Sequence, residues 1–316
     1  MNLNKLKSLS GDASFRKFYR HNNIIIVVSK KETRKNLLIY DAINKILIKN
    51  KIKAPKLISQ NYKSKNIQIE DFGNDSVYLI IKKNNKKKFI YYKKIIKLLN
   101  SIQKIKTKRI KTFLGSIYNV PNYSKKILLN EAKLFLDWYV PKKIKKEDQN
   151  LLKKKLISVL KSLINKIKFS NQTFVHRDFH VSNLMIKNKK LCLIDSQDAV
   201  FGNVAYDLAS LIDDVRLKTS TRLKKDIFKE YIKTNKKINI ENFKNDFEIL
   251  SVLRNLKIIG IFTRLSIRDK KDNYLKLIPY AWRLIEQRTE KNKKFIELKT
   301  ILDKYFSKKQ RNKYES

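Results

Sequence analysis

The stretch from Thr173 to Asp195 constrains the fold most, because it interrupts a chain whose patterns after Gly73 are otherwise helical. Its sequence is TFVHRDFHVSNLMIKNKKLCLID, in which short apolar runs enclose a polar loop and then a tight turn over residues 188–190. Short apolar runs on both sides of a turn that contains Asn are typical of a β-hairpin. The stretch therefore predicts a strand, a polar loop and a hairpin, in that order.

Two oxygen-bearing side chains are expected at the mouth of that hairpin. The turn over residues 188–190 brings Lys187 opposite Leu191. Counting outward from that pair brings Asn183 opposite Asp195. An amide oxygen and a carboxylate at this separation are ligands that Mg²⁺ takes while it keeps waters and phosphates in its other positions. The two residues are therefore candidate Mg²⁺ ligands.

The polar loop before the hairpin carries a candidate catalytic base. Asp178 lies on this loop, where it can accept a proton from a hydroxyl during phosphoryl transfer. The spacing H-x-D-x-x-x-x-N from His176, followed by a hairpin and I-D, is the phosphotransfer signature of the kinase fold. A lone histidine or aspartate is more often an ordinary loop or cap residue. Four polar residues at fixed positions on one strand, loop and hairpin favour the functional interpretation.

The pattern of the chain changes at Gly73. Before it, alternating and β-branched runs predict strands over 16–20, 24–30, 56–59 and 66–71, a tight turn at 21–23 and a helix over 32–49. After it, three- and four-residue spacing of apolar residues predicts helices over 89–105, 123–140, 150–169, 205–215, 222–233, 243–265 and 277–288. The sequence thus predicts an α+β chain with a β-rich N-terminal lobe over residues 1–72 and a mainly helical C-terminal lobe over residues 73–316.

A glycine-containing segment precedes the first predicted hairpin. Its small residues would let backbone N–H groups approach a phosphate, so Gly11, Asp12, Ala13 and Ser14 are candidates for a loop that covers the phosphates of a nucleotide. Lys30, at the end of the run IIIVVSK, is the nearest candidate for the lysine that kinases use to hold phosphates. In a chain this rich in lysine, chance alone supplies a lysine there about as often as not.

The composition limits the classes of protein to consider. A formal net charge of +46 is extreme, but 42% of residues are hydrophobic, so a disordered basic tail is excluded. Lysines are spread over almost every segment, whereas a nucleic-acid surface concentrates them on one face. The longest purely apolar run, Ile24 to Val28, predicts no membrane-spanning helix. A single cysteine, Cys192, allows no internal disulfide and predicts a cytoplasmic protein.

Taken together, these motifs resemble the aminoglycoside phosphotransferase and choline kinase superfamily, and more narrowly the kinases that phosphorylate the anomeric hydroxyl of N-acetylmuramate or N-acetylglucosamine in cell-wall recycling. The resemblance covers nearly the whole chain. It is carried by GDASFRKFYR, IEDFG, FVHRDFHVSNLMI, LIDSQDAVFGNVAYDLASL and LRNLKIIGIFTRLSIRDKKDNYLKLIPY. It implies a two-lobed protein-kinase-like fold that uses ATP and Mg²⁺.

The resemblance also implies roles for residues that the spacing leaves unassigned. Glu70 to Phe72 would be the hinge strand that meets adenine through its backbone, so Glu70 and Phe72 are candidate nucleotide contacts. Asp207, in AYDLAS, and His176 would support the catalytic loop. Asp178 would be the base, with Asn183 and Asp195 as Mg²⁺ ligands.

A small molecule is the expected acceptor. Only eleven residues separate Asp195 from Asp207, which leaves no room for a long activation segment or a peptide-docking platform. Asp198, Asp214 and Arg254 are candidate contacts to an amino-sugar substrate. An aminoglycoside, choline or a related amine is an alternative acceptor, disfavoured because a cationic acceptor needs an acidic pocket and the chain has 28 Asp+Glu. A basic nucleic-acid-binding protein is a more distant alternative.

Overall fold

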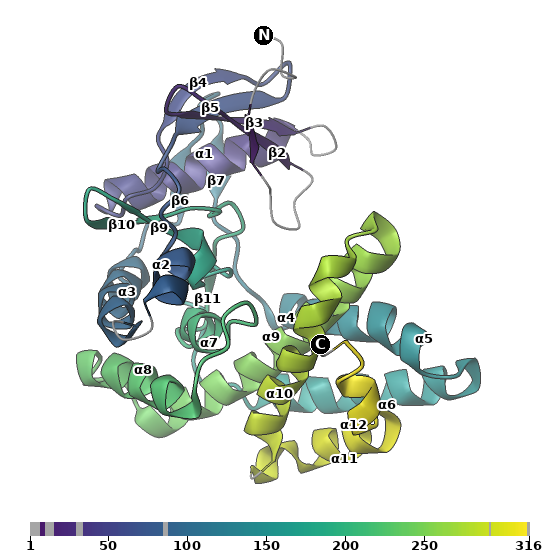
Figure 1. Cartoon of the computed structure of the whole chain (residues 1–316). Coiled ribbons are helices and arrows are strands. Elements are labelled where there is room, and N and C mark those ends of the chain that lie inside the picture. The colour runs from purple at the N-terminus through teal and green to yellow at the C-terminus, as the bar shows by residue number, and fades with distance from the viewer. Residues whose placement is uncertain (1–6, 10–15, 30–33, 85–87, 291, 315–316) are drawn as a thin grey trace. The chain divides into compact units, whose positions relative to one another are not determined.

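The structure is a computed structural model of the chain and describes residues 7–9, 16–29, 34–84, 88–290 and 292–314 (Figure 1). Contacts divide the chain into two compact units. One contains residues 1–122 and 172–201, and the other contains residues 123–171 and 202–316. The contacts thus group residues 172–201 with the N-terminal strands, and a lobe boundary between residues 72 and 73 stays a prediction.

The first unit begins with an antiparallel sheet that has five strands among the described residues. Its order is β1 (Lys7–Leu9), β2 (Arg16–His21), β3 (Ile24–Ser29), β5 (Asn66–Glu70) and β4 (Leu57–Asn61). The predicted turn between β2 and β3 is confirmed, because Asn22 and Asn23 have φ of 43° and 63°. A two-residue hairpin turn needs this left-handed pair, and asparagine tolerates it better than most residues.

Helix α1 (Arg34–Lys49) packs on this sheet and confirms the helix predicted over 32–49. The core between them consists of Ile25, Val27, Leu37, Tyr40, Tyr62, Ile67 and Ile69. Asn44 is a buried polar residue of α1. Its Nδ2 donates to the Pro55 carbonyl at 3.1 Å, and its Oδ1 accepts from Ser196 Oγ at 2.5 Å. The helix is therefore fixed to the segment that follows the predicted hairpin.

Two helices and a small hairpin follow the sheet in the first unit. They are α2 (Val77–Lys83), α3 (Lys88–Gln103), β6 (Arg109–Lys111) and β7 (Ile117–Asn119). The helix expected over 89–105 is confirmed by α3. The β6–β7 hairpin was not predicted, because each of its strands has only three residues and carries little apolar alternation.

Residues 173–195 form the predicted strand, loop and hairpin. It contains β8 (Thr173–Val175), the short helix η4 (Val181–Asn183), β9 (Leu184–Lys187) and β10 (Lys190–Leu193), and β11 (Val200–Gly202) then pairs with β8. The predicted register is wrong by one residue, because Lys190 rather than Leu191 faces Lys187. Asn188 and Lys189 both have positive φ, so the turn has two residues instead of three.

The second unit is helical among its described residues. It contains α4 (Lys125–Leu134), η3 (Phe135–Tyr139), α5 (Val140–Lys143), α6 (Lys146–Asn165), α7 (Tyr206–Ile212), α8 (Thr221–Thr234), α9 (Ile240–Asp269), η5 (Asp272–Leu277), α10 (Ile278–Thr289), η6 (Lys293–Phe295), α11 (Ile296–Tyr305) and α12 (Lys308–Arg311). These helices confirm the helical pattern, although a π-helical turn, η3, interrupts the segment predicted as one helix over 123–140. Within the described residues, no helix is both long enough and apolar enough to cross a membrane.

Helix α9 is the centre of this unit and packs against α4, η3, α7 and α10. The crossing with α4 is unusually close at Gly260. A Cβ atom built on Gly260 would lie 2.2 Å from the carbonyl carbon of Leu134 and 2.5 Å from the nitrogen of Phe135. Glycine is therefore the residue that this crossing requires.

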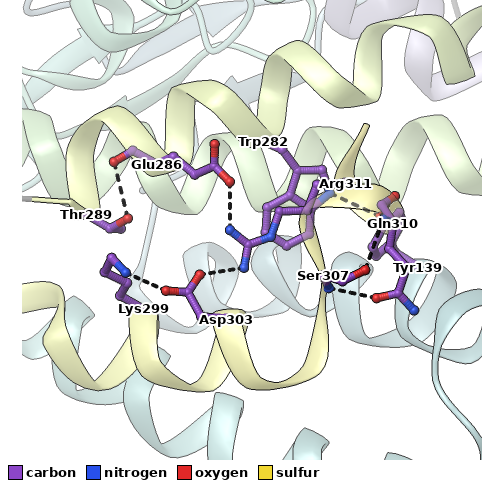
Figure 2. Close-up of polar contacts among 9 residues, drawn as sticks. All are labelled: Tyr139, Trp282, Glu286, Thr289, Lys299, Asp303, Ser307, Gln310 and Arg311. Carbon is purple, nitrogen blue, oxygen red and sulfur yellow. Dashed lines mark hydrogen bonds and ion pairs between the residues drawn. The ribbon is translucent and has the colours of Figure 1, made fainter. Parts of the chain in front are cut away.

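An arginine at the end of α12 joins α10 and α11 (Figure 2). Arg311 is 5% exposed, and its guanidinium lies 4.9 Å from the centre of the Trp282 ring. Its Nη1 donates to Glu286 and its Nη2 to Asp303, each at 2.7 Å. Asp303 also pairs with Lys299, whose side chain is much more exposed. The last described helix is thus held by one buried cation.

We expect Arg311→Met to lower the free energy of unfolding by about 1–3 kcal/mol, because it removes two charge-assisted hydrogen bonds and the contact with Trp282. Lys299→Met is the matched control, since it removes an exposed cation from the same carboxylate and should cost at most about 1 kcal/mol. Urea denaturation followed by circular dichroism measures both. Equal effects of the two substitutions would show that burial of Arg311 adds nothing.

Candidate active site

The loop between β8 and β9 is folded back on itself by hydrogen bonds to one carbonyl. The backbone oxygen of Asp178 accepts from the His180 N–H at 3.0 Å and from Asn183 Nδ2 at 2.9 Å. The Asn183 N–H in turn donates to the His180 carbonyl at 3.0 Å. These bonds fix the backbone at Asp178 without using its carboxylate.

The side chain of Asn183 has one end in use and one end available. Its Nδ2 donates to Asp178 and lies 3.4 Å from His180 Nε2. Its Oδ1 makes no hydrogen bond with any residue that the structure describes. The orientation of the amide therefore leaves an oxygen, the atom type that Mg²⁺ prefers, free for a ligand.

Ile194, which lies between the end of β10 and Asp195, places Asp195 next to Asn183. The Ile194 N–H donates to the Asn183 carbonyl at 3.1 Å, and the Ile194 carbonyl lies 3.1 Å from Nε2 of the buried His176. Asp195 then has φ of 62°, a conformation that costs a residue with a Cβ about 1 kcal/mol or more. The contact between His176 and the Ile194 carbonyl joins β8 to the residue before Asp195. It is consistent with the predicted role of His176 in supporting the catalytic loop.

Two charges of opposite sign act on the Asp195 carboxylate. Its partial removal from water and, to a smaller extent, the nearby Asp178 carboxylate raise the pKa of Asp195 to about 6, while Arg16 acts to lower it. Arg16 Nη2 lies 3.4 Å from Asp195 Oδ1, and the Asp195 side chain is 40% exposed. Asp178, Asn183 and Asp195 are therefore brought together, as the sequence predicted.

The segment after β5 has most of its backbone groups already paired. The Asp71 N–H donates to the Asn23 carbonyl at 3.3 Å, and the Gly73 N–H donates to Asp71 Oδ1 at 2.8 Å. The backbone N–H and C=O of Phe72 make no hydrogen bond within the described part of the chain. Buried backbone groups are nearly always paired, so an unpaired donor and acceptor at a predicted hinge fit a purine base.

Lys187 connects this segment to the hairpin. Its Nζ donates to Glu70 Oε1 at 3.0 Å and to the Asp71 carbonyl at 2.8 Å, and lies 5.6 Å from the centre of the Phe72 ring. Phe72 also packs with Met185 and Cys192. The predicted nucleotide contacts Glu70 and Phe72 are thus attached to the strand that begins directly after Asn183.

Other predicted site residues of the first unit are less informative. Gly11, Asp12, Ala13, Ser14 and Lys30 lie outside the described residues. Asp198 is described and exposed, with its carbonyl accepting from Arg177 Nη1 at 3.2 Å. Its predicted contact with an acceptor stays a prediction.

Asp207, Asp214 and Arg254 belong to the second unit and are buried. Burial raises the pKa of Asp214, against the lowering effect of Arg216 and Arg254. Asp214 Oδ1 accepts from the Arg216 N–H at 2.9 Å, but its buried Oδ2 has no partner among the described residues. Arg254 Nη1 is 3.4 Å from the Asp213 carbonyl. Asp214 and Arg254 are thus close enough to interact.

Two cations of this region, Arg16 and Lys187, were not predicted from the sequence. Each has specific partners in the structure, but no local pattern distinguishes either from the rest of a chain with 74 Lys and Arg residues. The alternation of β2 and β3 could have placed Arg16 on the same sheet face as its cross-strand neighbour Ser29.

The donor set fits a divalent cation that also binds phosphates. Among the described residues, no group of three or more His, Cys, Asp or Glu side chains could hold a metal ion by itself. Asn183 Oδ1 and the Asp195 carboxylate could provide two oxygen ligands, which is the usual protein share for Mg²⁺ bound with a nucleotide.

An aspartate, an asparagine and a second aspartate brought together on a loop and hairpin, in a unit with an antiparallel sheet, match the arrangement of the kinase-like phosphotransferases. The profile of the phosphotransferase enzyme family matches residues 5–238. The chain belongs to this family, and its family membership makes it an enzyme of phosphoryl transfer.

Similar proteins agree with this assignment. N-acetylmuramate/N-acetylglucosamine kinase of Neisseria meningitidis serogroup B is 31% identical over 166 residues, 51% of this chain and 50% of the relative. The protein of the same name from Pseudomonas aeruginosa is 25% identical over 304 residues, 93% of this chain and 86% of the relative. The ADP-bound structure of aminoglycoside phosphotransferase APH(2″)-Ib has a TM-score of 0.59 at 15% identity and covers 90% of this chain and 93% of that one. The predicted kinase-like fold is therefore confirmed.

Proposed function

We propose that this phosphotransferase uses ATP and Mg²⁺ to phosphorylate the anomeric hydroxyl of an N-acetylated amino sugar, N-acetylmuramate or N-acetylglucosamine, in peptidoglycan recycling. The names of the relatives at 25–31% identity support the acceptor. The observation that carries the proposal is the convergence of Asp178, Asn183 and Asp195. A cytoplasmic location is part of the proposal, since buried Cys192 is in no disulfide.

In this proposal, Asp178 orients the acceptor hydroxyl and accepts its proton as the oxygen attacks the terminal phosphorus of ATP. The bonds to its backbone carbonyl fix the backbone from which the carboxylate projects before the acceptor arrives. Asn183 Oδ1 and the Asp195 carboxylate would hold Mg²⁺, which neutralises phosphate charge when it is bound. The remaining task of the protein is to position the two substrates.

The nucleotide base is assigned to the segment from Glu70 to Phe72. The unpaired N–H and C=O of Phe72 support this assignment, because adenine offers a ring acceptor and an amino donor side by side. The ring of Phe72, packed with Met185, provides an apolar surface for the base. The net charge of +46 would increase the local concentration of anionic nucleotides.

The acceptor is assigned to Asp198, Asp214 and Arg254. Asp214 is the best supported of the three, because its buried Oδ2 has no partner and could accept a hydrogen bond from a sugar hydroxyl. The guanidinium of Arg254 could pair with the carboxylate of N-acetylmuramate. N-acetylglucosamine has no such carboxylate, so the two sugars would differ in their dependence on Arg254.

The proposed function is tested by phosphorus NMR of the purified protein with ATP, Mg²⁺ and one acceptor at a time. The acceptors are N-acetylmuramate, N-acetylglucosamine, choline and kanamycin, and Asp178→Ala is the control. We expect an anomeric sugar phosphate from at least one N-acetylated sugar, and no product from the control.

Three other results of the NMR experiment would change the proposal. A phosphorylated product from choline or kanamycin alone would replace the amino sugar by a cationic acceptor. A phosphate on another hydroxyl of the sugar would keep the substrate class but overturn the anomeric position. No product from any acceptor would contradict the proposed substrate class.

A further inference from the structure

We propose that Arg16 is the residue that binds the phosphates of the nucleotide, in the place that kinases give to a lysine. The inference rests on the proposed function and adds a binding residue to it. Neither the sequence pattern nor the resemblance assigns a role to this arginine.

Arg16 is a buried cation at the metal-binding end of the first unit. Its side chain is 6% exposed, and Nη2 lies 3.4 Å from Asp195 Oδ1. The guanidinium carbon lies 5.8 Å from the centre of the Tyr40 ring on α1. A buried arginine is rare unless it has a defined anionic partner, so its position next to a proposed Mg²⁺ ligand is specific.

The position of Arg16 in the chain also supports a role in phosphate binding. It is the first residue of β2, and only Phe15 separates it from the segment from Gly11 to Ser14, which is expected to cover the phosphates. It lies opposite Ser29, the last residue of β3. The strand pair therefore presents a guanidinium at its end, on the side of the sheet that reaches Asp195.

By its chemistry, a guanidinium beside a carboxylate can also contact a second anion. A distance of 3.4 Å is longer than the roughly 2.7–2.9 Å of a strong charge-assisted hydrogen bond. A guanidinium has five N–H donors in a planar fork, so it can contact the carboxylate and a phosphate oxygen together. Once Asp195 binds a cation, its attraction for Arg16 weakens, and a phosphate becomes the stronger partner.

A purely structural role for Arg16 makes a different prediction. If the guanidinium only balanced the charge of Asp195, its removal would change ADP binding only in the presence of Mg²⁺, because Asp195 is proposed to act on the phosphates through the metal. If Arg16 binds phosphates directly, ADP loses affinity with and without Mg²⁺, whereas adenosine, which has no phosphate, does not. Binding of ADP with and without Mg²⁺, compared with binding of adenosine, therefore separates the two roles without any measurement of turnover.

The experiment is isothermal titration calorimetry of ADP, with and without Mg²⁺, and of adenosine against four proteins. They are the wild type, Arg16→Ala, Arg16→Lys and Lys17→Ala. Lys17 is the matched control, because it is the next residue of β2, is exposed, and loses the same charge when replaced. Thermal unfolding of each protein shows whether it is folded.

We expect Arg16→Ala to weaken ADP binding by about 10- to 100-fold and to leave adenosine binding within about twofold. Arg16→Lys should restore part of the ADP affinity, and Lys17→Ala should bind both ligands like the wild type. If Arg16→Ala does not fold, Arg16→Lys carries the test, since lysine keeps the charge but loses the fork and should still lower ADP affinity selectively.

Unchanged ADP binding in folded Arg16→Ala would overturn the inference, as would an equal loss for adenosine. Selective loss of ADP binding in Lys30→Ala, with none in Arg16→Ala, would assign the phosphates to Lys30 instead. Absence of ADP and adenosine binding by the wild type would contradict the proposed function itself, and the inference with it. The two failures are thus distinguishable.

Discussion

Asp178→Ala is expected to lower kcat by about 10²- to 10⁴-fold, equivalent to a barrier about 3–5.5 kcal/mol higher. The proposed proton acceptor is then missing, while the hydrogen bonds from the His180 N–H and from Asn183 Nδ2 go to the carbonyl that the variant keeps. Folding and nucleotide binding should therefore be retained. Steady-state kinetics with the acceptor identified by NMR measures the loss, and thermal unfolding shows that the variant is folded.

The matched control for this variant is Glu297→Ala. Glu297 is an exposed carboxylate in the first turn of α11. Its substitution removes the same charge as Asp178→Ala at a position with no proposed role. Near-normal turnover of Asp178→Ala would refute the role of the carboxylate as base. A variant that loses ADP binding together with turnover would instead show that the loop had collapsed.

Gly260→Ala is expected to lower the free energy of unfolding by about 3 kcal/mol or more, at the upper end of the overpacking range. The new Cβ would meet the backbone of Leu134 and Phe135, which no change of rotamer can move. Helix propensity alone predicts the opposite sign, because Ala in a helix interior is favoured over Gly by about 0.5–1 kcal/mol. The sign of the measured change therefore decides between propensity and packing.

Urea denaturation gives this measurement, with Ile267→Ala as the control on the same helix. Ile267 is 43% exposed, so its truncation should change stability by less than about 1 kcal/mol. A Gly260→Ala protein as stable as the wild type would mean that α4 and α9 can separate without loss. The crossing would then be looser than the structure shows.

Local patterns predicted the elements that carry the candidate chemistry. The asparagine pair at residues 22 and 23 identified the β2–β3 turn, and alternating apolar runs identified β9 and β10. The register of β9 and β10 was off by one residue, because the sequence does not distinguish a two-residue turn from a three-residue turn at Asn188. Asn183 and Asp195 remained neighbours, since both lie just outside the paired residues.

Features that depend on distant parts of the chain could not be predicted. The partner of Arg16 is 179 residues away, and charge alone does not distinguish Arg16 from the rest of a chain with 74 Lys and Arg. The close crossing at Gly260 depends on the backbone of α4, and a lone glycine in a helical pattern does not reveal it. Such positions become visible only when tertiary contacts are known.

The contacts of Lys187 join two segments that the ribosome makes at different times. Lys187 follows Asp71 by 116 residues, yet donates to its carbonyl. At about 5–20 residues per second, a ribosome needs roughly 6–23 s to add that length. Throughout that interval the nascent sheet and α1 lack residues 172–201, the last part of their own compact unit. The sheet and α1 therefore cannot complete their compact unit until the hairpin has been made. During this interval the apolar surface of the unfinished unit is exposed, and a chaperone would be most useful then.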